Sequence, residues 1–133
     1  MRHEHPVQLR WSDPDSYGHV NHARALSLLE DARLAMAAQA PGTADGRTPD
    51  VILARLEVDY LRQLDYRARE VVCVITWLTR MGTKSFTMRH ELVQDGEVAI
   101  RADAVCVLFD YATNASRAMT EEERAHWTRY LET

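Results

Sequence analysis

The order of helix-like and strand-like stretches limits this chain to very few folds. Residues 23–39 are rich in alanine and leucine and contain neither glycine nor proline, a composition that favours a helix. After this stretch the sequence takes on strand character within residues 52–60, 71–78, 86–92 and 98–109. A helix followed by an unbroken run of strands predicts an α+β fold with a mostly antiparallel sheet.

The strand-like stretches differ in how their apolar residues are spaced. Residues 71–78 are apolar at nearly every position, which predicts a strand covered on both faces. Asp95-Gly96 separates the last two strands and predicts a hairpin. Residues 52–60 alternate, so one face of that strand is expected to carry Ile52, Ala54, Leu56, Val58 and Tyr60.

The two ends of the chain and the helix add further expectations. A short strand is expected over residues 5–11, and a helix over 120–131, which opens on a capping-box pattern. On the helix of residues 23–39, Arg33 shares a face with Leu29 and Met36, and its spacing allows a pair with Glu30.

Length and composition favour one ordinary globular domain over residues 1–133. Apolar residues make up 46% of the chain and charged residues 27%. The net charge is −4 and the basic residues are scattered, so nucleic acid is not an expected partner. No apolar run is long enough to span a bilayer and no signal-like segment opens the chain, so we expect a cytoplasmic protein without a membrane partner. Cys73 and Cys106 lack metal or redox spacing and are expected to be free thiols.

A polar turn joins the first strand to the helix, over residues 10–22. Pro14 and Gly18 punctuate it, and Asn21 is a suitable N-cap for the helix. Acidic and imidazole side chains therefore lie near backbone N–H groups that have no partner within the helix. Such a place can bind a carbonyl oxygen and stabilise the negative charge that it gains under attack.

The same turn carries a resemblance to a known family. Residues 13–22 read Asp-Pro-Asp-Ser-Tyr-Gly-His-Val-Asn-His, which resembles the D-x-D-x-x-G-H-V-N-N signature of hotdog-fold acyl-CoA thioesterases of the 4-hydroxybenzoyl-CoA thioesterase type. Glu30, Ala32 and Arg33 resemble the E-x-A-R of that family's central helix. The resemblance covers nearly the whole chain and implies a hotdog fold, an antiparallel β-sheet wrapped around one long central α-helix.

The resemblance also implies roles for individual residues. Asp15 matches the family's catalytic acid, which acts as nucleophile or as general base in thioester hydrolysis. His19 matches a family histidine that assists it, and the backbone N–H of His22 matches the oxyanion donor at the helix start. Asp13 is the second choice for the acid, and more simply holds the turn. Lys84 and Ser85 lie in a segment that resembles the family's contact to the coenzyme A phosphates.

The implied reaction is hydrolysis of an acyl-CoA or acyl-carrier-protein thioester. Coenzyme A is part of that substrate, so no cofactor is expected, and His3 and His5 without a third ligand do not predict a metal site. Hotdog proteins share their sites between subunits, so a homodimer or homotetramer is expected. The alternative is a non-catalytic module of the same fold that binds an acyl-CoA or acyl-carrier group, which the departures from the family pattern at Tyr17 and His22 allow.

Overall fold

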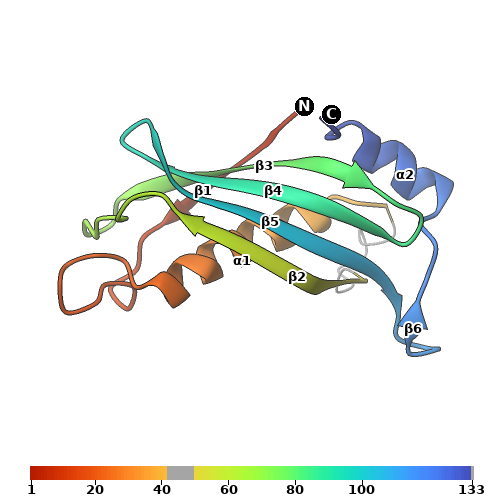
Figure 1. Ribbon diagram of the computed structural model, residues 1–133, viewed down its shortest axis with the longest axis horizontal. Coiled ribbons are helices and arrows are strands. Elements are labelled where there is room, and N and C mark those ends of the chain that lie inside the picture. Colours follow the sequence, from red (N-terminus) through yellow and green to blue (C-terminus); the bar gives the residue numbers. More distant parts are fainter. Residues whose placement is uncertain (42–49, 133) are drawn as a thin grey trace.

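A computed structural model of the chain describes residues 1–41 and 50–132 (Figure 1). The order of its elements confirms the prediction of one helix, then a run of strands, then a C-terminal helix. In chain order the elements are β1 (His3–Gln8), α1 (His22–Ala37), β2 (Val51–Tyr60), β3 (Val71–Met81), β4 (Ser85–Gln94), β5 (Glu97–Asp110), β6 (Ala115–Ser116) and α2 (Glu121–Thr128). No helix of the described residues is long and apolar enough to cross a membrane.

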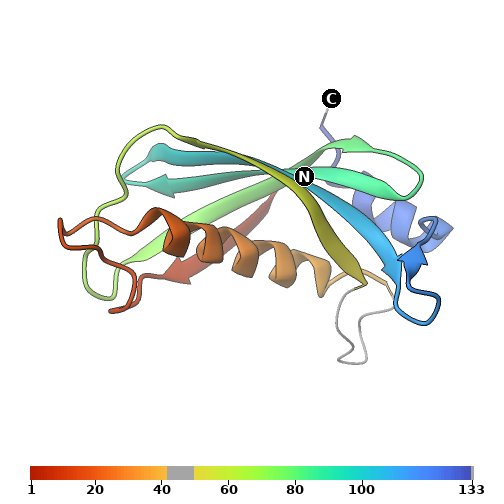
Figure 2. The ribbon, with the colours of Figure 1, turned by 60° about the horizontal axis from the view of Figure 1, so that its bottom comes forward.

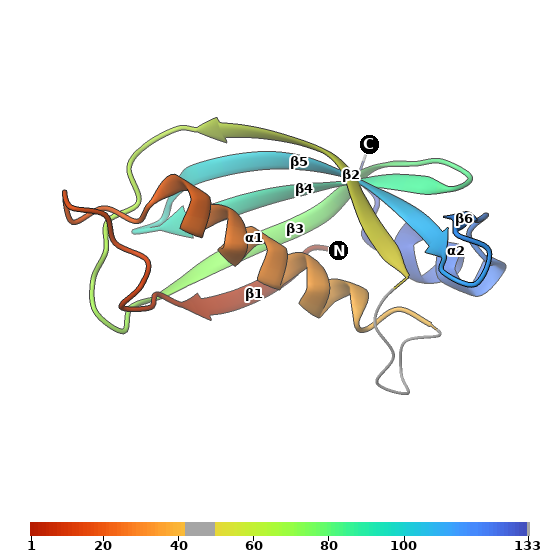
Figure 3. The same cartoon turned by 90° about the horizontal axis from the view of Figure 1, so that it is seen from below.

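The strands form one antiparallel sheet in the order β1-β3-β4-β5-β2, with β6 paired to the end of β5. The loop between β4 and β5 is the predicted Asp-Gly hairpin, and Asp95 and Gly96 both have a positive φ, as a tight primed turn requires. Helix α1 runs across one face of the sheet (Figures 2 and 3). The sheet edges are β1 and β2.

Two apolar clusters fill the space between α1 and the sheet. The first half of α1 contributes Leu28 and Leu29, which are completely buried against β3 and β5 residues such as Val74 and Ala102. The second half contributes Met36 to a cluster that α2 also joins. There Trp127 stacks on Phe86 with ring centroids 4.8 Å apart. The predicted capping box of α2 is present at Thr120.

One expectation for β2 is wrong at its first half. The register with β5 shifts between Leu53 and Arg55, so Ala54 lies in a β-bulge. A bulge adds one residue and reverses the alternation of inward-facing and outward-facing side chains. The buried Cys106 therefore pairs with Leu53 rather than Ala54, and the buried Leu108 pairs with Val51 rather than Ile52. The helix-facing side of β2 therefore carries Val51, Leu53, Leu56, Val58 and Tyr60.

The expectation that residues 71–78 are covered on both faces also needs correction. Alternate residues such as Val74 and Thr76 are buried, whereas Cys73 and Ile75 on the other face are only half-buried. Within the described residues, α1 and α2 pack into the clusters of a single face. On the other face, the Arg2 guanidinium lies 3.7 Å above the centroid of the Trp77 ring. Cys73 and Cys106 are both free thiols.

Candidate active site at the start of helix α1

Asp13 holds the polar turn together from inside. Its side chain is completely buried. One carboxylate oxygen accepts the Arg10 backbone N–H at 2.7 Å, and the other accepts the Arg10 guanidinium at 3.1 and 3.2 Å. Its carbonyl accepts the Asn21 N–H at 2.8 Å. Because all of these bonds are internal to the turn, Asp13 holds the turn, which is the role that the sequence favours for it.

Asp15 differs from Asp13 because it is only half-buried. Its Oδ1 accepts the backbone N–H groups of Tyr17 at 2.8 Å and His19 at 3.2 Å. Gly18 completes this tight loop with a φ of +78°, a conformation that costs other residues free energy. Two backbone donors thus fix the direction of the carboxylate. Its second oxygen, Oδ2, has no hydrogen-bond partner in the part of the chain that the structure describes.

Helix α1 begins immediately after this turn, as the N-cap pattern predicted. Asn21 Oδ1 accepts the N–H groups of Ala23 at 2.9 Å and Arg24 at 3.4 Å. The N–H of His22 is the first of the helix and has no acceptor among the described residues. The imidazole of His22 is exposed and meets the Tyr60 ring edge-on, with centroids 6.2 Å apart.

A pocket of about 450 Å³ lies where the turn and the helix start face the end of β2. Asp15, Asn21 and His22 line one side of it, and Tyr60, Arg62 and Leu64 are among the residues that line the other. The structure thus brings two of the predicted residues, Asp15 and His22, into one pocket. A carboxylate can act as nucleophile or base, and a helix N-terminal N–H can stabilise an oxyanion, so this pair suits an attack on a carbonyl carbon.

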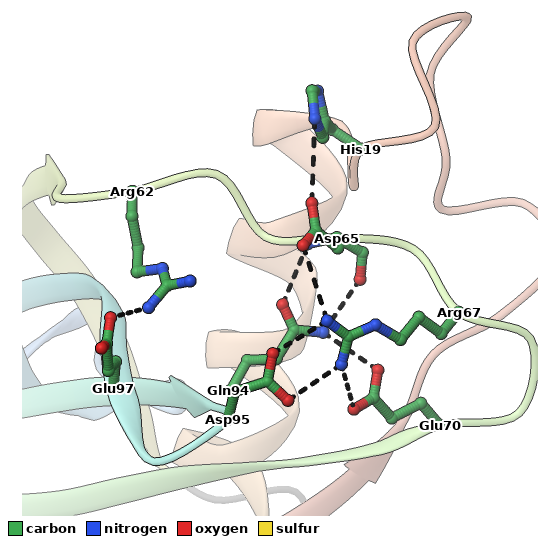
Figure 4. Close-up of polar contacts among 8 residues, drawn as sticks. All are labelled: His19, Arg62, Asp65, Arg67, Glu70, Gln94, Asp95 and Glu97. Carbon is green, nitrogen blue, oxygen red and sulfur yellow. Dashed lines mark hydrogen bonds and ion pairs between the residues drawn. The ribbon is translucent and has the colours of Figure 1, made fainter.

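His19 lies beside this pocket and turns toward Asp65 (Figure 4). Its Nε2 is 3.8 Å from Asp65 Oδ1, and the two residues form an antiparallel bridge. Neighbouring backbone bonds extend this pairing, from the Val20 N–H to the Leu64 carbonyl at 2.7 Å and from the Tyr66 N–H to the Gly18 carbonyl at 3.0 Å. The turn and the segment after β2 therefore form one unit.

Gln94, at the end of β4, fixes that unit to the sheet (Figure 4). Its side chain is buried, and its amide accepts the Asp65 N–H at 3.0 Å and donates to the Asp65 carbonyl at 2.9 Å. It also donates to Glu70 at 3.0 Å. Nearby, Arg67 donates to both oxygens of Asp95 at 2.9 and 2.8 Å, and this pair lowers the pKa of Asp95.

Sequence reasoning missed Asp65 and Gln94. Their separation of 29 residues leaves no local pattern to reveal the contact. The Asp-Gly hairpin is the only sequence signal nearby, since Gln94 comes directly before it.

Lys84 and Ser85 lie far from the pocket within one chain. Lys84 ends the connection between β3 and β4, and Ser85 is the first residue of β4. This connection lies at the opposite end of the sheet from the start of α1 (Figures 1 and 3). Lys84 is exposed and Ser85 is half-buried. The structure therefore does not unite them with Asp15 and His22 in a single subunit. Within the described ranges, no group of three histidine, cysteine or acidic residues is arranged to hold a metal ion.

The family of this chain follows from its sequence as a whole. The family model of the Thioesterase-like superfamily matches residues 9–127. The chain belongs to the Thioesterase-like superfamily. None of the curated proteins gives a significant match to it.

Solved structures agree with this thioesterase-like assignment. A thioesterase from Thermus thermophilus, complexed with coenzyme A and Zn, is 29% identical to this chain. The match covers 92% of this chain and 94% of the Thermus chain, with a TM-score of 0.78. A protein described as a predicted thioesterase from Bacillus stearothermophilus is 23% identical over 100% and 98% of the two chains, with a TM-score of 0.90. SAV2348 from Staphylococcus aureus, in complex with CoA, is 16% identical over 100% and 87%, with a TM-score of 0.84. The last two show a shared fold, which is the hotdog fold of thioesterases.

Proposed function

We propose that this thioesterase-like protein hydrolyses the thioester of an acyl-CoA or acyl-carrier protein. The observation that carries the proposal is the pocket at the start of α1, which Asp15 and His22 both line. Membership in the Thioesterase-like superfamily supports the reaction class. The relatives that contain coenzyme A support an acyl-CoA substrate.

The chemistry follows from these two groups. The substrate's carbonyl oxygen accepts the N–H of His22, which stabilises the oxyanion that forms when the carbonyl carbon is attacked. Asp15 either attacks that carbon through Oδ2 or removes a proton from a water that attacks it. The carbon–sulfur bond then breaks, and the thiolate leaves and takes a proton. Where water attacks, the acyl group departs directly as a carboxylic acid. Where Asp15 attacks, the acyl group stays on Asp15 as a mixed anhydride, which a water molecule then hydrolyses to the carboxylic acid and the free Asp15 carboxylate. His19 assists from the side of the pocket, held by its contact to Asp65.

The arrangement of subunits belongs to the same proposal. Helix α1, of 16 residues, takes the place of the central hotdog helix. The edge strand β2 offers its unpaired backbone groups to a second copy, giving a homodimer or a homotetramer. Lys84 and Ser85 then bind the phosphates of a coenzyme A whose thioester reaches another subunit's pocket, which accounts for their distance from Asp15 in one chain.

A thiol-release assay with a panel of aromatic and aliphatic acyl-CoAs tests this function. Asp15→Asn removes the charge of the carboxylate, and Asp31→Asn, at an exposed position of α1, is the matched control. We expect turnover by the natural protein and by the control, and its loss in Asp15→Asn. Binding of acyl-CoA by the natural protein without any turnover, on this panel and on acyl-carrier thioesters, would favour the alternative, a non-catalytic binding module.

A further inference from the structure

Arg33 is a buried arginine without a hydrogen-bond or ion-pair partner among the described residues. It lies on the sheet-facing side of α1 with 9% of its surface exposed. Its Nη1 is enclosed and makes no hydrogen bond within the described residues. The predicted pair with Glu30 does not form there as an ion pair, although the exposed Glu30 carboxylate attracts the guanidinium from a greater distance. Burying a charge without a partner is unfavourable, so this position would be stabilised by an anion.

Arg33 lines a second pocket, separate from the one at the start of α1. This pocket has a volume of about 160 Å³ and lies between the second half of α1 and the edge strand β2. Its walls are mostly apolar and include Leu34, Val51, Leu53 and Met88. The bulge in β2 creates it, because the reversed alternation turns Val51 and Leu53 toward the helix.

The titratable groups inside this region do not neutralise Arg33. Cys106 lines the pocket, and burial raises the pKa of its thiol to about 11, so the thiol stays protonated. His90 feels the guanidinium charge, and burial together with Arg33 lowers its pKa to about 3, so the imidazole stays neutral. The charge of the Arg33 guanidinium is therefore not balanced by Cys106 or His90. An anion that enters the pocket from outside would balance it.

We propose that the pocket beside Arg33 binds a small organic carboxylate, with its apolar body between α1 and β2 and its carboxylate on the guanidinium. Arginine binds carboxylates through paired, charge-assisted hydrogen bonds. The volume suits a compact apolar body, since an engineered cavity of about 150 Å³ in another protein holds benzene. Glu30 at the rim disfavours multiply charged anions such as phosphate, which leaves a single carboxylate as the fitting ligand.

Two sources supply this chemistry. One is a carboxylate at the far end of the acyl group, and that reading rests on the proposed function. Because Arg33 lies about 16 Å along the helix axis from His22, at 1.5 Å per residue, such an acyl chain has to be long or has to reach across subunits. The other source is a free carboxylic acid, for example the product of hydrolysis, which binds regardless of turnover.

Calorimetric titration of the intact protein with pentanoate, and with 1-pentanol as its uncharged match, tests the pocket. The variants are Arg33→Met and, as the control, Arg80→Met at an exposed position on β3. We expect pentanoate to bind the natural protein and Arg80→Met, with affinity at least tenfold lower in Arg33→Met, while 1-pentanol distinguishes none of them. Arg33→Lys keeps the charge without the paired geometry, so we expect intermediate affinity; this variant serves if Arg33→Met does not fold.

Turnover of dodecanedioyl-CoA and dodecanoyl-CoA separates the two sources. If Arg33→Met loses turnover of dodecanedioyl-CoA but keeps turnover of dodecanoyl-CoA, the ligand of Arg33 is the carboxylate at the end of the acyl group. If Arg33→Met turns over both substrates at the natural rates but binds pentanoate more weakly, the ligand is a free carboxylic acid. Because Asp15→Asn should keep its pentanoate affinity, failure of the thioesterase proposal leaves this test intact. Equal pentanoate affinity in all variants would overturn the proposal. A change in the oligomeric mass of Arg33→Met would also overturn it, because Arg33 would then contact a partner subunit rather than a carboxylate ligand.

Discussion

Mild acid should destabilise this protein through one histidine of its core. His90 on β4 is completely buried, with Nδ1 2.8 Å from Thr76 Oγ1 and with Nε2 enclosed and unpartnered within the described residues. Burial first, and then the charge of Arg33, lower its pKa to about 3. At mildly acidic pH, His90 therefore stays neutral in the folded protein but is protonated in the unfolded chain.

The pH range of this effect follows from the two pKa values. The unfolded histidine has a pKa of about 6.5, so His90 leaves stability unaffected well above that pH. As the pH falls from about 6.5 toward 3, only the unfolded state takes up the proton, and the free energy of unfolding decreases. Between pH 7 and pH 5 the loss from this one residue is about 2 kcal/mol.

Urea unfolding at pH 7, 6 and 5 measures the loss, with His90→Asn as the test variant. Asparagine keeps a polar atom near Thr76 but cannot be protonated, so His90→Asn should lose about 2 kcal/mol less than the natural protein over this range. His22→Asn, at an exposed histidine, should keep the natural pH dependence. The lowered pKa values of His3 and His126 act in the same direction but are common to all three proteins, so they cancel in the comparison. An unchanged pH dependence in His90→Asn would refute the reasoning.

Two further substitutions test how the candidate site is held in place. Gln94→Met fills the same space but leaves the Asp65 N–H and carbonyl without their partner. We therefore expect the free energy of unfolding in urea to fall by about 2 kcal/mol and kcat/KM in thiol release to decrease. Unchanged values of both would show that Gln94 does not position the pocket wall. Asp13→Asn keeps the shape of the buried carboxylate but removes its charge opposite Arg10, so thermal unfolding should show a loss of about 1.5–3 kcal/mol, and an unchanged Tm would contradict its structural role.

The sequence predicted those parts of the structure that depend on neighbours in the chain. The helix from His22 to Ala37 follows from composition and from the cap at Asn21. The strands follow from alternation, from the apolar run of residues 71–78 and from the Asp-Gly hairpin. The shared pocket of Asp15 and His22 also follows, because Asp15 lies in the turn that leads into α1 and His22 is the first residue of that helix.

Features that depend on distant parts of the chain could not be predicted. The bulge at Ala54 depends on how β2 meets β5, and strict alternation gave no sign of it. The contact of Gln94 with Asp65 joins the end of β4 to the segment after β2. The residue spacing predicts Arg33 on the apolar face of the helix and allows a pair with Glu30. Only the packed structure shows that, among the residues it describes, Arg33 Nη1 is enclosed and makes no hydrogen bond.

The rate of thiol release by Asp15→Asn, set against that of Asp31→Asn on the best acyl-CoA, tests the central claim most directly. Positioned general acid–base groups typically contribute about 10²–10⁴-fold to a rate. We predict a fall in kcat of at least about 10²-fold in Asp15→Asn, with the fold intact and with no comparable fall in Asp31→Asn. Turnover by Asp15→Asn at the natural rate would contradict the assignment of this pocket as the active site.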